Sequence, residues 1–458
     1  CSLEGKGDVG NHMLRIERRP FNGKGIIKEG IIHGEPMPEN HAEFQWNILA
    51  PGAYPPEYAE KNCIYQRNLP MNTQSAVRDR YAAGAKSRED SLCCPVDYDS
   101  RYLEVIPEEV IARDYGCGDP SKYLHPGESV LDLGSGTAKI CFIASQVVGS
   151  KGKVIGVDMT DDMLEVARRN APLVAERTGF SNVSFHKGRI EDLALDLEKF
   201  EARLQANPVT SANEFLAAED LADKMRAGDP MIANDTIDVV VSNCVLNLVD
   251  NRLKEKLFRE IYRVLKIGGR AVISDIVCDE PVPKEMQDDP ELWSGCISGA
   301  FVEDEFLRAF ENAGFHGVQI LQLGHEPWKT VNGIEFRSMT VEAFKGDDGP
   351  CLEGMQAVIY RGPFKTVVDD DGHPMQRGKR YALCRKTYEM YRRAPYSGFF
   401  EFMEPHQSPG SGSAEAFDCT QTRLRDPHET KGSIFNPSSP SECCGDDPPG
   451  TKKPGNCC

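Results

Sequence analysis

The sequence predicts an α/β fold built on a parallel, doubly wound sheet, and three observations support this expectation. Short apolar runs recur in the middle of the chain, at Ser129–Leu133, Val154–Asp158 and Ile237–Ser242. Stretches with helical periodicity separate these runs, and strands that alternate with helices are typical of parallel sheets. A glycine-rich turn follows the first run, at the place where such folds bind a ligand.

Two more strands complete the expected sheet, at Val183–His186 and Arg270–Asp275. Helices are predicted at Thr73–Tyr81, Pro107–Arg113, Ile140–Val148, Asp161–Arg169 and Asn251–Leu265. Gly268 and Gly269 are expected to end the last of these helices, because glycine is common just beyond a helix. A long polar insert, residues 195–232, is also expected to be helical.

Composition divides the chain into four parts, because 458 residues are too many for one ordinary domain. We expect an N-terminal extension with little regular structure at 1–73 and the α/β domain at 74–345. A small C-terminal domain, mainly β or α+β, is expected at 346–405. Its segments MQAVIYRGPF and KRYALCRKTYEMY are predicted to form a β-hairpin. The remainder, 406–458, is rich in Pro, Ser, Gly and Cys and is expected to be disordered and flexible.

The charge balance argues against two classes of partner. The formal net charge is −18, and no basic cluster exceeds two residues, whereas a nucleic-acid binder presents a basic stripe. Anionic membranes are disfavoured for the same reason, and no apolar run reaches the roughly 18 residues that a spanning helix needs. The first residues also contain no apolar signal core. We therefore expect a cytoplasmic, monomeric protein with neither nucleic acid nor a membrane as partner.

Cysteine is unusually frequent, with 16 residues. A secreted disulfide framework is one explanation, but it fits poorly with a long α/β core. Metal, metalloid or redox chemistry in a reducing compartment fits better. Adjacent pairs strengthen this interpretation, because two neighbouring thiols can reach one soft ion: Cys93 with Cys94, Cys443 with Cys444, and Cys457 with Cys458.

The glycine turn lies in the stretch VLDLGSGTAKI, which starts at Val130. Gly134 and Gly136 permit a tight turn and a close approach of the backbone to a ligand, and the helix that follows offers free N–H groups. Asp158 ends the next strand, where a carboxylate can accept hydrogen bonds from both ribose hydroxyls. The dinucleotide fingerprint requires a third glycine at the position of Lys139, so NAD is the less favoured cofactor.

Three segments together carry a resemblance. LDLGSG, GVDM and KGRIEDL, which start at Leu131, Gly156 and Lys187, resemble the class I S-adenosylmethionine-dependent methyltransferases in sequence and in spacing. This resemblance implies a Rossmann-like core and S-adenosylmethionine as the cofactor.

Three cysteines are expected to meet beside that cofactor. Cys244 directly follows the fourth strand, and Cys296 follows the fifth strand after a loop. Cys117 precedes the first strand and can cover the site from the N-terminal side. Ligands in open α/β sheets bind outside the carboxyl ends of the strands, and thiolates select soft, thiophilic centres. Trivalent arsenic takes three sulfur ligands and keeps a lone pair that can attack a methyl carbon.

Over about residues 74–345 the chain resembles the arsenite methyltransferases. The matching segments are DYGCG, VLDLGSG, CFIASQVVG, GKVIGVDMT, IDVVVSNCVLNLV, FREIYRVLKIGGRAVISDI and ELWSGCISGAF. In that family three cysteines bind As(III), and the resemblance carries this role onto Cys117, Cys244 and Cys296. Another cysteine, nearer the N-terminus, takes part in disulfide exchange that keeps arsenic trivalent. Cys94 is the best match, with Cys93 as the alternative.

The same resemblance implies the cofactor pocket and a thiol reductant, glutathione or thioredoxin, as co-substrate. Asp158 would hold the ribose, while Ile190 and Glu191 would flank the adenine. The full set of expected cofactor positions is Tyr115, Asp132, Gly134, Ser135, Gly136, Asp158, Met159, Ile190, Glu191, Asn243 and Val245.

The sequence departs from the family pattern in four places. The segment around Cys93 and Cys94, SREDSLCCPVDYD, matches only loosely, the N-terminal extension and the 195–232 insert are longer, and the small domain aligns poorly. These departures leave selenium, tellurium, mercury or an organoarsenical open as the methyl acceptor. A non-enzymatic, thiol-rich metalloid binder is the other alternative, although the intact Gly134, Gly136 and Asp158 argue against it.

The other cysteines have less specific expectations. Cys141 lies on a helix that faces the sheet, where core packing is favoured, and Cys278 is interpreted as a bystander. Cys351, Cys384 and Cys419 belong to the small domain or its edge, and both packing and a separate thiol site stay open for them. The ten histidines form no metal-spaced cluster, so a catalytic zinc site is not expected.

Overall fold

The computed structural model describes residues 73–87, 89, 96–113, 115–410 and 414–432. Nearly all of the N-terminal extension expected at 1–73 therefore lies outside the described residues. Within the described part of the chain, no helix is long and apolar enough to cross a membrane.

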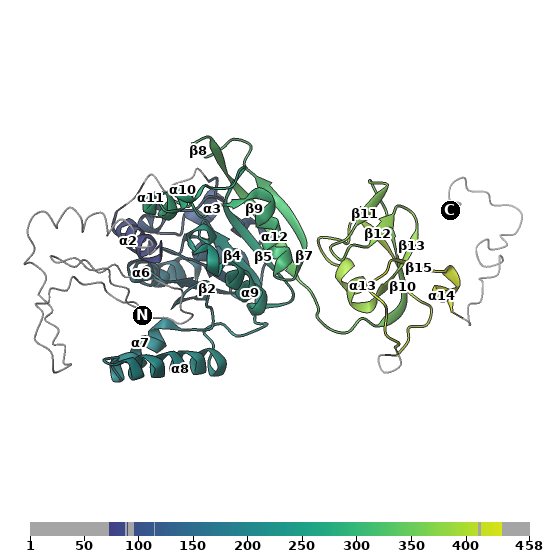
Figure 1. Cartoon of the computed structure of the whole chain (residues 1–458), viewed down its shortest axis with the longest axis horizontal. Coiled ribbons are helices and arrows are strands. Elements are labelled where there is room, and N and C mark those ends of the chain that lie inside the picture. The colour runs from purple at the N-terminus through teal and green to yellow at the C-terminus, as the bar shows by residue number, and fades with distance from the viewer. Residues whose placement is uncertain (1–72, 88, 90–95, 114, 411–413, 433–458) are drawn as a thin grey trace, which may run out of the picture. The chain divides into compact units, whose positions relative to one another are not determined.

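A mixed central sheet forms the α/β domain, with the strand order β3-β2-β1-β4-β5-β9-β7 (Figure 1). Its parallel strands are β1 (Ser129–Leu133), β2 (Lys153–Asp158), β3 (Val183–Lys187), β4 (Ile237–Asn243) and β5 (Leu265–Cys278). The antiparallel strands are β9 (Ile334–Lys345) and β7 (Phe315–Leu323), and short β6 (Phe301–Val302) and β8 (Lys329–Val331) pair with β5 and β9. The five expected parallel strands are confirmed, whereas the antiparallel edge was not predicted.

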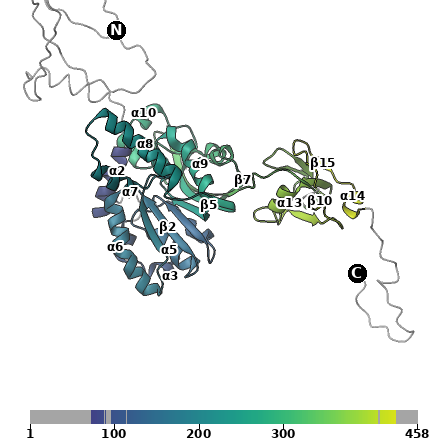
Figure 2. The ribbon, with the colours of Figure 1, turned by 90° about the horizontal axis from the view of Figure 1, so that it is seen from below.

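Helices cover both faces of this sheet. The longer ones are α2 (Thr73–Lys86), α5 (Lys139–Val148), α6 (Asp161–Thr178), α9 (Lys254–Val264) and α12 (Glu303–Asn312). Short helices are α3 (Ser100–Leu103), α4 (Glu108–Ala112), α10 (Lys284–Gln287) and α11 (Pro290–Ser294), with 3-10 turns η2 (Pro120–Tyr123), η3 (Leu246–Leu248) and η4 (Asn251–Leu253). Figure 2 shows α5 and α6 beside β2.

Alternate residues of β1 pack into two separate hydrophobic cores, one on each face of the sheet. Val130 of β1 packs with α5 and α6, while Leu131 and Leu133 pack with α9 and α12 on the opposite face. Because successive side chains of a strand point to opposite faces, this division requires an apolar residue at nearly every position. The continuous apolar runs in the sequence are the consequence of this two-sided burial.

The expected end of the fifth helix was wrong. Helix α9 stops at Val264, and β5 begins at Leu265, so Gly268 and Gly269 lie inside the strand. The register between β4 and β5 shifts at this point, and Gly268 has a φ of +77°. These glycines therefore accommodate an irregular stretch of strand rather than a helix end.

The insert forms two helices, α7 (Leu197–Ala206) and α8 (Ala212–Gly228), as the sequence predicts. Helix α8 begins where the Ser211 hydroxyl accepts a hydrogen bond from the Glu214 N–H at 3.3 Å. Its side chains are mostly exposed, including Phe215 and Leu216.

The small domain has its own sheet, in the order β14-β10-β13-β15. Its strands are β10 (Glu353–Tyr360), β13 (Arg380–Cys384), β14 (Phe400–Met403) and β15 (Arg423–Leu424), with a separate pair β11 (Thr366–Val368) and β12 (Pro374–Gln376). Helices α13 (Arg385–Tyr391) and α14 (Pro427–Lys431) complete it. Aromatic side chains dominate its core, including Tyr360, Tyr388 and Tyr391.

Two expectations for this domain needed correction. Strands β10 and β13 do pair antiparallel, but residues 385–391 are a helix rather than part of a hairpin. Strand β15 and helix α14 lie where a flexible tail was expected from residue 406. Long-range contacts order this segment, because the fully buried Arg425 side chain forms an ion pair with Glu353 at 2.6 Å. Residues 433–458 lie outside the described part of the chain.

We predict that Phe310→Ala lowers the free energy of unfolding by about 3–5 kcal/mol, the usual cost of emptying a buried aromatic site. Phe310 is fully buried, and its ring centroid lies 4.8 Å from that of Phe258. The matched control is Phe215→Ala, because Phe215 is 55% exposed and the change should cost less than about 0.5 kcal/mol. Urea denaturation followed by circular dichroism measures both, and equal effects would contradict this packing.

Candidate active site

A cavity lies at the carboxyl ends of the parallel strands, bordered by the loops after β1, β2, β3 and β4. All the positions expected to bind cofactor line it: Tyr115, Asp132, Gly134, Ser135, Gly136, Asp158, Met159, Ile190, Glu191, Asn243 and Val245. Helix α2 also lines it with Gln74, Val77 and Tyr81. The structure thus brings the predicted positions to one cavity, and their contact with a cofactor stays a prediction.

Glycine is required in the turn after β1 for two different reasons. A side chain on Gly134 would clash with Val245, so the turn packs closely against the loop after β4. Gly136 has a φ of +51° and no atom near the place of a Cβ, so its backbone is open to a ligand. Asp158 holds the turn, because its carboxylate accepts hydrogen bonds from the Gly136 N–H at 2.9 Å and the Thr160 N–H at 2.8 Å. Burial raises the pKa of Asp158, and these N–H bonds partly offset that shift.

The cavity lining has the chemical character that S-adenosylmethionine requires. The Ser135 hydroxyl oxygen is buried and has no hydrogen-bond partner among the described residues, so it is available to a ligand. Met159 and Ile190 offer apolar surface for a flat base. Asp132, Asp158 and Glu191 bring carboxylates to the lining, which suits a cationic sulfonium and a ribose.

The three predicted cysteines lie together at one end of this cavity. Cys117 and Cys244 are joined by a disulfide, with their Cα atoms 5.7 Å apart. The Cys296 thiol donates a hydrogen bond to the Cys244 carbonyl at 3.2 Å, and the Tyr81 hydroxyl lies 3.9 Å from the same sulfur. All three cysteines are buried, and Cys244 also lines the cavity. Cys244 therefore links the thiol group to the expected cofactor site.

Two of these cysteines have unusual backbone conformations. Cys244 and Cys296 each have a φ of +61°, in the left-handed region that favours glycine. Such a residue costs about 1–3 kcal/mol and persists only where its surroundings hold it. The Cys244 N–H donates to the Ser274 carbonyl at 2.8 Å, and Cys296 follows α11, where the buried Trp293 donates to the Leu248 carbonyl at 3.2 Å. Trp293 anchors this segment and does not line the cavity.

Asn243 positions the Cys117 loop. Its side-chain oxygen accepts hydrogen bonds from the N–H groups of Cys117 at 2.9 Å and Gly118 at 3.0 Å, and its amide donates to the Gly118 carbonyl at 2.8 Å. A side chain on Gly116 would clash with the Asn243 amide. Asn243 was expected only in the cofactor pocket, and its bonds give it a second task at the thiol end.

Asp275 belongs to the site, although the sequence analysis did not identify it. Its carboxylate oxygen and the sulfurs of Cys117 and Cys244 all lie within 4.8 Å of one another. Burial raises its pKa to about 6, although its bonds from the Ile276 and Leu246 N–H groups, both 2.8 Å, lower it. The sequence signal that could have identified Asp275 was an acidic residue within an apolar strand run, as at Asp158. Helix α2 gave no comparable signal for its place at the cavity.

The remaining cysteines of the α/β domain lie outside the cavity lining. The Cys141 thiol is buried and donates to an Asp132 carboxylate oxygen at 3.2 Å. Cys278 donates to the Phe301 carbonyl at 3.2 Å, and burial raises its pKa to about 12. Cys93 and Cys94, the alternatives for the disulfide relay, lie outside the described residues.

Comparisons with known proteins identify a methyltransferase domain and a second domain in this chain. A family model described as a methyltransferase domain matches residues 124–314, and one described as a domain of unknown function matches residues 347–435. A solved structure, an arsenic (III) S-adenosylmethionine methyltransferase from Chlamydomonas reinhardtii, is 25% identical with a TM-score of 0.44. That match covers 71% of this chain and 100% of the other.

Curated relatives give a more specific result. The arsenite methyltransferase of Homo sapiens is 28% identical over 362 residues, which are 75% of this chain and 86% of that protein. The arsenite methyltransferase of Aquipseudomonas alcaligenes is 32% identical over 349 residues, which are 72% of this chain and 90% of that protein. With this identity sustained over most of the relative's length, and with a methyltransferase domain at its centre, the chain belongs to the arsenite methyltransferase family.

Proposed function

We propose that this protein transfers the methyl group of S-adenosylmethionine to trivalent arsenic bound by Cys117, Cys244 and Cys296. The observation that carries the proposal is the position of the thiol group. Two of the sulfurs are bonded to each other, the third is hydrogen-bonded to the Cys244 backbone, and Cys244 borders the cavity of the glycine turn. Membership of the arsenite methyltransferase family supports the choice of arsenic.

Arsenic binding requires three free thiols. Each S–H exchanges with one As–OH group of arsenous acid, which forms an As–S bond and releases one water. The exchange moves no net charge into the site, which suits cysteines that are at most 5% exposed.

The chain's residues then have distinct tasks around the bound cofactor. Asp158 would accept the ribose hydroxyls, and Ile190 and Glu191 would flank the adenine. The Ser135 hydroxyl is free to donate. When bound, S-adenosylmethionine supplies a methyl group on a positively charged sulfur, open to attack by the arsenic lone pair. The cysteines hold arsenic with this lone pair free, and fixing both partners in line supplies much of the rate.

The disulfide gives the cysteines a redox task. Arsenic that has shared its lone pair with a methyl group is formally pentavalent. If the arsenic–sulfur bonds to Cys117 and Cys244 break and these two sulfurs bond to each other, their two electrons return arsenic to the trivalent state, and a Cys117–Cys244 disulfide is the product. Water then adds to the methylated arsenic that Cys296 still holds, and one proton is released. A thiol reductant, glutathione or thioredoxin, must then supply two electrons and two protons. The proposal therefore includes this reductant and a reducing, cytoplasmic environment, with Cys94 or Cys93 as the relay.

We predict that Cys296→Ser lowers the rate of arsenic methylation by roughly 100-fold or more, because arsenic loses one ligand and its alignment. Liquid chromatography with arsenic-specific detection measures the products, and calorimetry should show unchanged S-adenosylmethionine binding. Cys278→Ser is the matched control, since Cys278 is a buried thiol in the same apolar cluster and its hydrogen bond suits a hydroxyl equally well. Full activity in both variants would refute the cysteine assignment.

The Cys117–Cys244 disulfide should control the activity. Protein purified with Cys117 bonded to Cys244 should not methylate arsenite until a phosphine reductant is added, because two of the three ligands are unavailable. Cys244→Ser cannot form this bond and should stay inactive with or without reductant. Methylation at the same rate by the oxidised and the reduced protein would show that this pair does not bind the reacting arsenic.

Substitution of Asp158 should separate cofactor binding from arsenic binding. Asp158→Asn should weaken S-adenosylmethionine binding by roughly 10- to 100-fold, the usual effect of removing a hydrogen bond to a charged group. Asp161→Asn, on the exposed first turn of α6, should leave the affinity within about twofold. Isothermal titration calorimetry measures both, and arsenite binding should change in neither. Equal affinities in the two variants would place the ribose elsewhere.

A further inference from the structure

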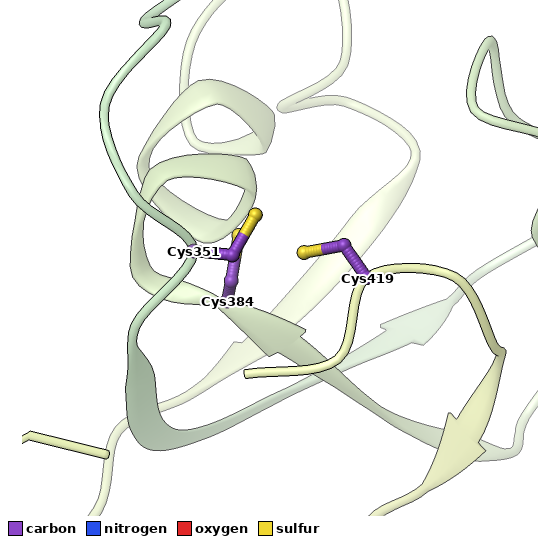
Figure 3. A group of neighbouring side chains, drawn as sticks. All are labelled: Cys351, Cys384 and Cys419. Carbon is purple, nitrogen blue, oxygen red and sulfur yellow. The ribbon is translucent and has the colours of Figure 1, made fainter. Parts of the chain in front are cut away.

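A second group of thiols lies in the small C-terminal domain. The sulfur atoms of Cys351, Cys384 and Cys419 all lie within 4.8 Å of one another, and none of these residues lines the cavity of the α/β domain. Cys384 is buried, and the other two are half-buried. Figure 3 shows the Cys419 sulfur directed toward Cys351 and Cys384. All three are free thiols in this structure.

Backbone pairing builds this convergence from three distant segments. Cys351 precedes β10, Cys384 ends β13 and pairs with Glu353 in the register of the two strands, and Cys419 precedes β15. The Phe417 N–H donates to the Cys351 carbonyl at 2.9 Å, and the Arg385 N–H donates to the Leu352 carbonyl at 2.9 Å. The segments on both sides are therefore tied to the one that carries Cys351, so the fold itself holds the sulfurs together.

Sulfur is the ligand atom that this cluster offers, because the neighbouring polar side chains already have hydrogen-bond partners. Both ring nitrogens of His373 already have partners: Nδ1 lies 3.0 Å from an Asp369 carboxylate oxygen, and Nε2 lies 2.7 Å from the Cys419 carbonyl. The Thr387 hydroxyl lies 3.2 Å from the Cys384 sulfur. In the described part of the chain, no histidine or carboxylate joins the three sulfurs as a further ligand.

Three sulfurs that have no fourth ligand among the described residues discriminate between soft centres. Structural zinc prefers four ligands and requires deprotonated thiols. Three thiolates around Zn²⁺ would leave a net negative charge in a largely buried place, which is unfavourable. A neutral, three-coordinate centre meets neither difficulty.

We propose that Cys351, Cys384 and Cys419 form a second, trithiol site that binds inorganic trivalent arsenic. Each S–H exchanges with one As–OH, which forms an As–S bond and releases one water, and no electron or net proton is transferred. Arsenous acid offers three exchangeable hydroxyls, whereas its monomethyl and dimethyl products offer two and one. The site therefore selects the unmethylated substrate over the products. The choice of arsenic rests on the proposed function, whereas the convergence of the sulfurs does not.

The test uses the full chain with Cys117, Cys244 and Cys296 all changed to Ser, which removes the thiol group of the α/β domain. With a phosphine reductant present, we expect one tightly bound arsenic per chain, with three sulfur neighbours by arsenic X-ray absorption. Adding Cys419→Ser should weaken arsenite binding by roughly 100-fold or more, because losing one of three linked ligands forfeits its high effective concentration. Cys351→Ser should do the same, and melting temperatures check that each variant is folded.

A matched control changes the terminal cysteines Cys443, Cys444, Cys457 and Cys458 to Ser in the same background, and it should retain the bound arsenic. The proposal is overturned if this control loses the arsenic, or if the Cys419 and Cys351 variants keep it. Zn²⁺ binding with proton release, in place of arsenite binding, would overturn it as well. In otherwise unaltered protein, Cys419→Ser should reduce bound arsenic from two to one per chain.

Failure of the methylation proposal is a separate result. It would appear as unaltered, reduced protein that transfers no methyl group to arsenite, whatever the number of arsenic atoms bound. Monomethylarsonous acid provides a further check on the trithiol site, since it should bind there more weakly than arsenite by roughly the effect of one lost ligand. Equal binding of the two arsenicals would contradict selection for the unmethylated form.

Discussion

In the central sheet, β1 pairs in parallel with β2 on one side and with β4 on the other. The register places Asp132 beside Gly156 and Val241, so all three strands end at one level. The turn after β1 then lies against the loop after β4, where Gly134 leaves room for Val245. Asp158 at the end of β2 and Cys244 beyond β4 reach the same cavity through this pairing. The other parts of the candidate site are arranged around the carboxyl ends of these three strands.

The parallel half of the sheet was predictable because burial on both faces leaves continuous apolar runs, such as the one in β4. The antiparallel edge was harder to predict, since most positions of β7 are partly buried or exposed and its apolar pattern is correspondingly weak. The glycine turn and the three cysteines could be predicted because their local motifs follow one another in a recognisable order along the chain. Asp275 and helix α2 could not, because their place in the site depends on contacts between distant segments. Cys351, Cys384 and Cys419 were found as residues, but their meeting depends on the pairing of β10 with β13 and the segment before β15.

Hydrogen bonding places the same side chains in two tasks at once. Asn243 lines the cavity and also holds the backbone of Cys117 and Gly118. Asp158 braces the glycine turn and Thr160 while its carboxylate borders the cavity. Short polar contacts thus connect the two halves of the site. Left-handed backbone at Cys244 and Cys296 indicates that this arrangement is maintained at some cost in stability.

The Cys117–Cys244 bond joins residues 127 positions apart and closes a covalent ring that includes β1, β2, β3 and both insert helices. A cross-link over so long a segment restricts the unfolded chain, and loops of this size are associated with about 4–5 kcal/mol of stabilisation. The oxidised chain is therefore the more robust form, while the proposed function assigns arsenic binding to the form with free thiols. If the proposed function holds, resistance to unfolding and readiness for methyl transfer belong to opposite redox states of one molecule, and one reductant would control both.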